Sequence, residues 1–358
     1  MIYIALVFLL LIWISILQTL SRQESSIQRL FLFISGTMLA LLSGFRFETG
    51  GDFYANYVGF IKASSMSFKE IFWSYDEYGH MLFRKLISLF TEDPQWYFII
   101  SSAWIILSFF IFIYRYSANP YLSVLLFVTL GQYFVAHNIT RQYIAISICL
   151  YAIPFLLSRK MIRYMIIILI AMTFHTSAIV MIPLYFLVLI NISGQTILKY
   201  MIGIAFLNAG FGAVLPWIQK FVYSDEYMEG SYGVQEANML NALLPALLFI
   251  LLCCFYYIEY IKNKENRMSV VSSAMIHMGL ISFLFSTLSV TSMLILNRIG
   301  GYFMVSYLII IPLLIARTEP RKKGLLYLSI LTICLAYFVL NVFLGRLTPK
   351  PYIPFWKY

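Results

Sequence analysis

Four short polar motifs interrupt an otherwise apolar chain, and the first lies at residues 46–54. It contains Arg46, the pair Gly50-Gly51, Asp52 and Tyr54. Consecutive glycines allow a tight turn and a close approach of the backbone to a ligand. Asp52 is suited to act as a general base or to orient a sugar hydroxyl, Arg46 to bind an anion, and Tyr54 to contact the substrate. The alternative is an ion pair between Arg46 and Asp52 at the end of a loop.

The second motif, at residues 137–142, contains Asn138, Arg141 and Gln142. Arg141 is expected to open a helix that runs into the membrane, where a guanidinium is costly unless it faces a cavity or an anion. Its planar fork of donors suits phosphate oxygens, with Asn138 and Gln142 as further ligand contacts. The alternative is an interfacial arginine that reaches out to lipid phosphates.

The other two motifs are Phe174–Ala178, which contains His175, and Asn297–Tyr302, which contains Arg298. His175 interrupts an apolar stretch. It is either a hydrogen-bonded packing residue or an imidazole at a water-accessible vertex, where it could transfer a proton. Arg298 again follows an asparagine and precedes two glycines, so it is a second candidate for binding an anion.

The elements that position these motifs are membrane helices. Of the 358 residues, 61% are hydrophobic and only 11% are charged, whereas soluble domains carry roughly a quarter charged residues. The net charge of +10 lies in short loops between apolar stretches, which is typical of cytoplasmic loops and argues against nucleic-acid binding. The four cysteines form no pairing framework or zinc spacing. We therefore expect one integral membrane domain, residues 1–358.

A membrane-crossing helix needs about 20 apolar residues. Ten candidate spans meet this description: about 2–20, 30–45, 96–115, 120–136, 142–157, 199–222, 239–260, 270–291, 299–316 and 324–344. The remaining stretch, 161–190, fits best as a helical hairpin that turns near His175. The predicted fold is all-α: a polytopic membrane helix bundle with about 11–12 transmembrane or re-entrant segments.

Loop charge is the reason for the hairpin. Without it, the loop 223–238, which holds Asp225, Glu226, Glu229 and Glu236 and no basic residue, falls inside. With it, the inner loops hold 14 of the 25 basic residues and 4 of the 15 acidic ones, which satisfies the positive-inside rule. One large outer loop, about 46–95, remains. Its pieces 53–63 and 80–90 have apolar residues at helical spacing, as in amphipathic helices on a membrane face.

This topology, chosen from loop charges alone, places the four polar motifs on the outer side. Three arginines, an aspartate and a histidine at one depth indicate a site for a polyanion, such as pyrophosphate, with an acid–base group.

The motifs resemble those of the EpsG family, Wzy-like membrane proteins of bacterial polysaccharide assembly. The resemblance rests on the order Arg46…Gly51-Asp52…Tyr54, then Asn138…Arg141-Gln142…Ala145, then Phe174-His175…Ser177-Ala178. It implies a glycosyltransferase that polymerises undecaprenyl-pyrophosphate-linked repeat units, as for O-antigen, capsule or exopolysaccharide, at the outer face of the cytoplasmic membrane. Its partners would be the lipid-linked oligosaccharide, the bilayer, and chain-length-regulator and flippase proteins.

In such a reaction, Arg141 and Arg298, supported by Arg46, would stabilise the leaving pyrophosphate. Asp52 is the first choice for the base. Nearby arginines lower the pKa of a carboxylate, however, so His175 could take the proton while Asp52 positions the sugar. No acidic cage for a metal is present in the sequence, and no cofactor or metal is expected. The alternatives are a flippase or transporter for the same glycan, and a ligase or acyltransferase.

Overall fold

The computed structural model describes residues 2–20, 25–222, 239–262, 268–291, 295–344 and 352–357. Several predictions concern residues outside these ranges: the acidic loop 223–238 with Asp225, Glu226, Glu229 and Glu236, and the inner-loop residues Arg22, Glu24, Lys264, Glu265 and Arg267. The chain divides into two compact units, unit 1 with residues 1–179 and 319–358 and unit 2 with residues 180–318.

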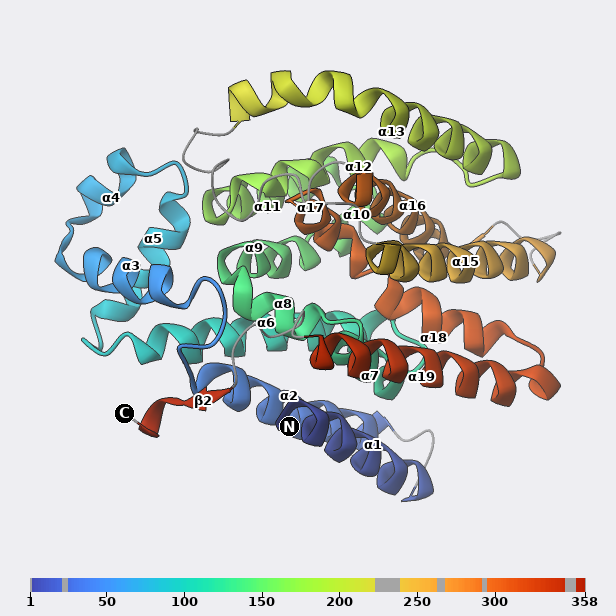
Figure 1. The fold of residues 1–358 in the computed structure, drawn as a ribbon, viewed down its shortest axis with the longest axis horizontal. Coiled ribbons are helices and arrows are strands. Elements are labelled where there is room, and N and C mark those ends of the chain that lie inside the picture. The colour runs from blue at the N-terminus through green and yellow to red at the C-terminus, as the bar shows by residue number, and fades with distance from the viewer. Residues whose placement is uncertain are drawn as a thin grey trace. The chain divides into compact units, whose positions relative to one another are not determined.

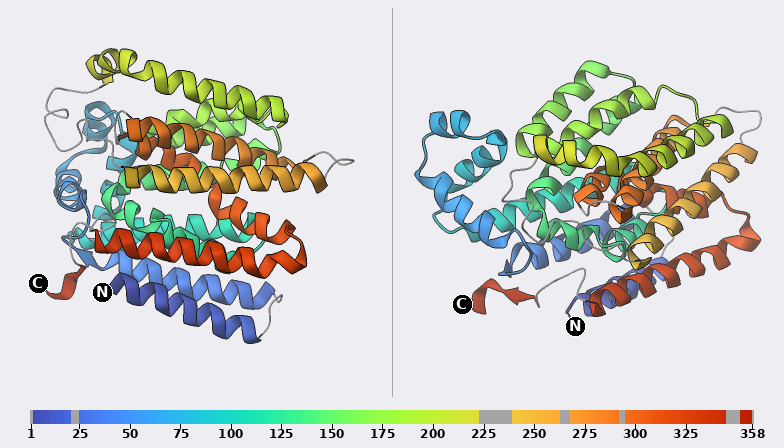
Figure 2. Two further views of the ribbon diagram at one scale, coloured as in Figure 1. Left: turned by 45° about the vertical axis from the view of Figure 1, so that its right-hand side comes forward. Right: turned by 45° about the horizontal axis from the view of Figure 1, so that its top comes forward.

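Unit 1 is built mainly from long apolar helices. In chain order they are α1 (Ile2–Leu20), α2 (Ser25–Gly44), α6 (Gln95–Tyr116), α7 (Pro120–Thr129), α8 (Gln132–Asn138), α9 (Thr140–Leu150), α10 (Ile153–Leu157), α11 (Met161–Phe174) and α19 (Pro320–Phe343). Helix α1 runs beside α2, and α2 packs along α6 (Figures 1 and 2). Helix α9 packs between α6 and α11, contacting both.

The segment between α2 and α6 folds into three short helices, which confirms the predicted helical pieces of the large loop. They are α3 (Phe53–Ser65), α4 (Phe68–Ser74) and α5 (Tyr78–Ser88), and they gather at the N-terminal end of α6 (Figure 1). Helix α4 begins with a capping box between Ser67 and Glu70, which satisfies two backbone N–H groups at its start. Apolar side chains of α3 and α5 pack on the first turn of α6, so α3, α5 and α6 form one small core.

The C-terminal tail returns to this region. Strand β2 (Ile353–Pro354) pairs antiparallel with β1 (Arg46–Phe47), and a short 3₁₀ helix (Phe355–Lys357) follows. The backbone N–H of Phe355 donates to the carbonyl of Phe45 at 3.0 Å. The tail therefore fixes the strand that carries Arg46.

Unit 2 contains α12 (Ile182–Leu187), α13 (Gly194–Val222), α15 (Met239–Lys262), α16 (Val270–Thr291), α17 (Ile295–Met304) and α18 (Tyr307–Arg317), and a 3₁₀ turn (Thr176–Met181) leads into it. Helix α15 packs on α16 and α18. The buried carboxylate of Glu259 lies 3.3 Å from Nε of Arg317, an ion pair that ties the C-terminal ends of α15 and α18 together.

The all-helical membrane bundle is confirmed. Among the described residues, six helices are long and apolar enough to cross a membrane, or up to eight when each bent pair, α7 with α8 and α17 with α18, counts as one span. Three of the remaining predicted segments appear as shorter apolar helices, at Tyr3–Ile14, Met161–Phe174 and Thr176–Leu187. A helix break falls at His175, and the return of the chain as a hairpin stays a prediction.

Candidate active site

Glu77, at the N-terminus of α5, joins two of the predicted site residues. It occupies the N-cap position, yet its side chain does not cap its own helix. One carboxylate oxygen lies 2.5 Å from Nδ1 of His175, and the other accepts from Nη1 of Arg141 at 3.1 Å. The backbone N–H of Thr176 also donates to this carboxylate, at 3.1 Å. We call Glu77, Arg141 and His175 the Glu77 cluster.

Three elements of unit 1 meet at the Glu77 cluster. Arg141 lies in the first turn of α9, as predicted. His175 is the C-cap of α11, with extended backbone angles that end the helix and turn its imidazole toward α5. The approach of α5 to α11 is close at Gly79, where an added Cβ would lie 2.1 Å from the Thr173 hydroxyl oxygen. A glycine at this position lets the two helices touch.

The electrostatics of the Glu77 cluster favour an ionised carboxylate. Burial by itself would raise the pKa of Glu77. The hydrogen bond and charge of His175, the Thr176 N–H and the charge of Arg141 outweigh burial and lower this pKa below its ordinary 4.5. Arg141 remains 42% exposed and His175 27% exposed at the side chain, so both can reach a bound molecule.

The Gly50-Gly51 turn docks against the second motif. The backbone N–H of Gly51 donates to Oδ1 of Asn138 at 3.0 Å. Gly50 has a φ of +100°, and a Cβ there would lie 2.3 Å from the carbonyl oxygen of His137. Asn138 thus holds the turn against the boundary of α8 and α9, next to the helix that carries Arg141.

Asp52 and Tyr54 follow this turn at the start of α3. Asp52 is the N-cap residue of α3, is partly exposed, and acts electrostatically on Arg84. The hydroxyl of Tyr54 donates to the carboxylate of Glu48. The role of Asp52 toward a substrate stays a prediction.

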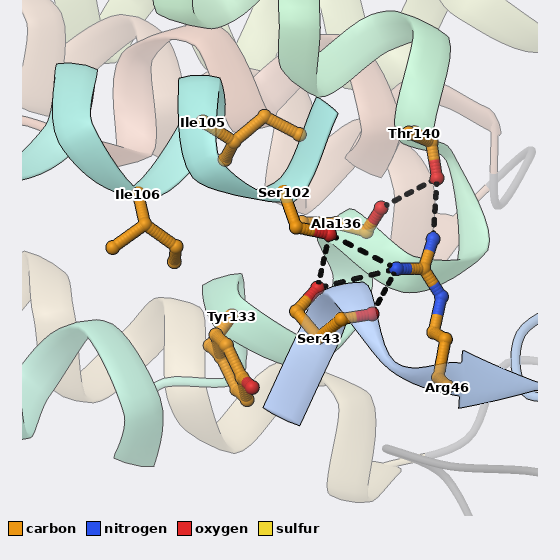
Figure 3. A pocket seen from close by; sticks show the side chains of 8 residues that line it. All are labelled: Ser43, Arg46, Ser102, Ile105, Ile106, Tyr133, Ala136 and Thr140. Carbon is orange, nitrogen blue, oxygen red and sulfur yellow. Dashed lines mark hydrogen bonds between the residues drawn. The ribbon is translucent and has the colours of Figure 1, made fainter. Parts of the chain in front are cut away.

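Arg46 is buried, with 1% of its surface exposed. Its Nη1 donates to the carbonyl of Ser43 at 2.6 Å and to the hydroxyls of Ser43 and Ser102 at 3.2 Å each (Figure 3). Its Nη2 donates to the hydroxyl of Thr140 at 3.2 Å. In the described part of the chain no acidic side chain pairs with it, so the alternative ion pair with Asp52 is not formed.

The surroundings of Arg46 leave little room for a ligand. The cavity that it lines measures about 10 Å³, space for a single water at most. Burial lowers the pKa of its guanidinium to about 10, which leaves it charged at neutral pH. Arg46 anchors Thr140, the neighbour of Arg141, and is shielded from bulk solvent. Direct binding of an anion, the predicted role, would require the side chain to leave this cage.

A second buried polar network lies beside the Glu77 cluster on α3, α5 and α6. Nη2 of Arg84 donates to Oδ1 of Asn56 at 2.6 Å, and the hydroxyl of Tyr97 donates to the same oxygen at 3.2 Å. Nε2 of His80 lies 2.9 Å from the Tyr97 hydroxyl. His80 is one turn along α5 from Glu77, so this network fixes the helix that carries the carboxylate.

The last two predicted residues lie apart in sequence. Gln142, next to Arg141, is buried in the first turn of α9. Arg298 lies in α17 of unit 2 and is partly exposed. Its convergence with Arg141 of unit 1 stays a prediction.

Glu77 carries no motif in the sequence and was not among the predicted site residues. It is one of several acids in the outer loop, beside Asp76, and 64 residues separate it from Arg141. One signal in the sequence pointed to such a residue. Arg141 and His175 are predicted at the same depth, and a carboxylate of the outer loop could pair with both. Among the described residues, no group of three or more His, Cys, Asp and Glu side chains is arranged to hold a metal ion.

The fold and the site define a class: a helical membrane protein with a carboxylate–histidine–arginine cluster where α5, α9 and α11 meet. The chain belongs to the EpsG family, a family of Wzy-like polysaccharide polymerases, whose sequence model matches residues 29–358. This confirms the resemblance and extends it over nearly the whole chain. No curated protein and no solved structure matches it.

Proposed function

We propose that this protein polymerises undecaprenyl-pyrophosphate-linked oligosaccharide repeat units at the outer face of the cytoplasmic membrane. The observation that carries the proposal is the Glu77 carboxylate, which binds Nδ1 of His175 and Nη1 of Arg141 at once. It places a group suited to proton transfer beside a cation suited to a leaving pyrophosphate. Membership in the EpsG family supports the same reaction class.

His175 is the base in this proposal. The Nδ1–H of the neutral imidazole donates to Glu77, which leaves Nε2 as the proton acceptor. The carboxylate holds the ring in this tautomer and stabilises the imidazolium after transfer, as the aspartate does in serine-protease triads. Glu77 is therefore a positioning residue for His175.

Arg141 receives the leaving group. Nη1 contacts Glu77 while much of the side chain is exposed, so the rest of the guanidinium fork can face phosphate oxygens. Charge that builds on the pyrophosphate in the transition state meets a donor already in place, which costs no reorganisation. Glu77 restrains the Arg141 side chain and so pre-organises the fork.

The proposed reaction forms one glycosidic bond and breaks one bond to pyrophosphate. A hydroxyl oxygen of the acceptor glycan attacks the anomeric carbon of the donor repeat unit, and its proton passes to Nε2 of His175. The bond from that carbon to the pyrophosphate oxygen breaks, and undecaprenyl pyrophosphate leaves as an anion beside Arg141. The imidazolium then returns the proton to water or to the released phosphate.

The other predicted residues keep supporting roles in this proposal. Asp52 and Tyr54 orient the sugar, and Asn138 and Gln142 support the start of α9. Arg46 anchors Thr140 beside it. Arg298 contributes a second cation from α17, and a flippase and a chain-length regulator act before and beside the protein.

The deciding assay uses the purified protein in lipid nanodiscs with a synthetic lipid-linked repeat unit. Longer glycan products support the proposal. Arg141→Ala and His175→Ala should each abolish polymer, whereas Arg321→Ala, which removes an exposed arginine at the start of α19, should not. A chelator should leave polymer formation unchanged. Substrate that only changes leaflet, with no longer product, would instead make the protein a flippase.

A further inference from the structure

An apolar groove lies at the junction of α5 and α6, in unit 1. Its volume is about 590 Å³. Phe83, Leu86, Ile87 and Phe90 line it from α5 and the turn that follows, and Trp96 and Ile100 line it from the first turns of α6. Thr91 is the polar member of this lining. The groove therefore offers almost nothing for hydrogen bonding and suits a hydrocarbon.

The position of the groove along the chain puts it at a membrane boundary. Helix α6 begins at Gln95 and is a candidate span, so its first turns, with Trp96, lie where a span enters the headgroup region. Phe90 is 88% exposed, and Leu86 and Trp96 are about half exposed. So much apolar surface in one place indicates a surface that another molecule covers.

The groove lies near the Glu77 cluster along α5. Phe83 lines the groove, and its ring lies 6.3 Å from that of Phe174, the residue before His175. Glu77 occupies the N-cap position of the same helix. Phe83 is six residues along α5 from Glu77, which corresponds to about 9 Å at the helical rise, and the groove extends from there toward Phe90.

We propose that this groove binds the hydrocarbon chain of the lipid-linked substrate while its pyrophosphate lies at Arg141. The proposal rests on the function proposed above and gives the substrate a direction: head at the N-terminal end of α5, chain along its C-terminal half. The chain of a polyprenyl pyrophosphate starts at the phosphate, so a groove that holds it must begin within a few helical turns of the cation. This groove does.

The first test measures binding without glycan transfer. The full-length protein in nanodiscs is irradiated with a photoreactive polyprenyl pyrophosphate that carries no sugar, and the labelled peptides are mapped. We expect label on the peptides that contain Phe83–Ile100, displaced by unlabelled polyprenyl pyrophosphate. Phe90→Ser should weaken this labelling by about tenfold, since burial of one large apolar side chain is lost. Trp73→Ser, which alters an exposed aromatic residue on α4, should not.

Two outcomes would overturn the proposal. One is label confined to other helices. The other is equal labelling of the groove by a phospholipid with the photoreactive group in its acyl chain, not displaced by polyprenyl pyrophosphate, because the groove would then contact only bulk lipid. The test needs no turnover. A protein that holds the probe in the groove yet makes no polymer would refute the proposed polymerase reaction and leave the groove assignment standing.

A second test uses kinetics. With lipid-linked substrates of long and short prenyl chain, the wild-type protein should have the lower KM for the long chain. Phe90→Ser should remove that preference by raising KM for the long chain more than for the short one. If the variant instead lost activity equally on both chains, the groove would be structural and the proposal would fail.

Discussion

A carboxylate that binds a histidine and an arginine at once can serve each of them differently. In the proposed mechanism it selects the His175 tautomer with the proton on Nδ1, and it fixes the orientation of the Arg141 side chain. The lowered pKa of Glu77 keeps it ionised through the neutral range. The stability of these pairs is fully present above pH 4.5 and is lost as the pH falls through the lowered pKa.

The variant Glu77→Gln tests these roles of the Glu77 carboxylate. The amide keeps the size of the side chain but removes its charge, so in the proposed mechanism it would no longer stabilise the imidazolium or the tautomer with Nε2 free. We expect the rate of polymer formation to fall by about 10²–10⁴-fold, the usual contribution of a positioned acid–base group. Binding of the lipid-linked substrate should change little. Wild-type turnover in this variant would remove Glu77 from the mechanism.

His80 gives a pH prediction for stability. Burial, followed by the charges of Arg84 and Arg141, lowers its pKa well below 6.5. The unfolded chain then binds a proton that the folded protein does not, so stability is full above pH 6.5 and falls below it. Below pH 6.5 stability should fall by roughly 1 kcal/mol per pH unit, read from thermal unfolding midpoints. His80→Gln should flatten this dependence, and an equally steep loss in that variant would assign it to another group.

Among the elements, the contact of α5 with α11 decides whether the Glu77 cluster forms. Glu77 and His175 each lie at a helix end, and neither helix alone brings them together. The contact depends on a residue with no Cβ at position 79, because Thr173 occupies the space where a side chain would be. The buried polar network on α3, α5 and α6 and the packing of α4 on α5 hold α5 in this position.

Gly79→Ala should therefore act on the site from a distance of two residues. The added methyl group must displace α5 or α11, which we expect to cost about 1–3 kcal/mol of stability. It should also move Glu77 from His175 and lower the polymerisation rate as Glu77→Gln does. Gly324→Ala is the matched control, because a Cβ there meets nothing within 4 Å. Equal activity of both variants would show that the helix contact does not position the site.

At the scale of the whole molecule, orientation in the membrane determines which substrates the Glu77 cluster meets. The loop charges predict that the end of the bundle with α3, α4 and α5 faces outward. They also require the chain to return after His175.

Cysteine labelling of intact cells tests this orientation. In a variant without the four native cysteines, a cysteine at Asp76 should react with a membrane-impermeant reagent. Cysteines at Asn191 and Lys322 should react only after the cells are opened. All three native residues are exposed in the structure. Labelling of position 191 from outside would contradict the hairpin, and labelling of 322 would reverse the whole topology.

Much of this protein follows from its sequence because a bilayer leaves few choices. Apolar stretches of about 20 residues must become helices, since unpaired backbone groups are too costly in hydrocarbon. Arg141 and His175 could be singled out because a polar group inside such a stretch is costly unless it has a partner or a ligand. The helical pieces of the 46–95 loop followed from their apolar spacing.

The partners of these residues were decided by the tertiary structure. Glu77 and Arg141 are 64 residues apart, and Glu77 and His175 are 98 apart, so no local pattern joins them. Arg46 has the sequence context of an exposed ligand-binding arginine, yet hydroxyls from three helices and one backbone carbonyl enclose it. Spacing along a chain determines which face of a helix a residue occupies. Only the packing of helices against one another determines which charges meet.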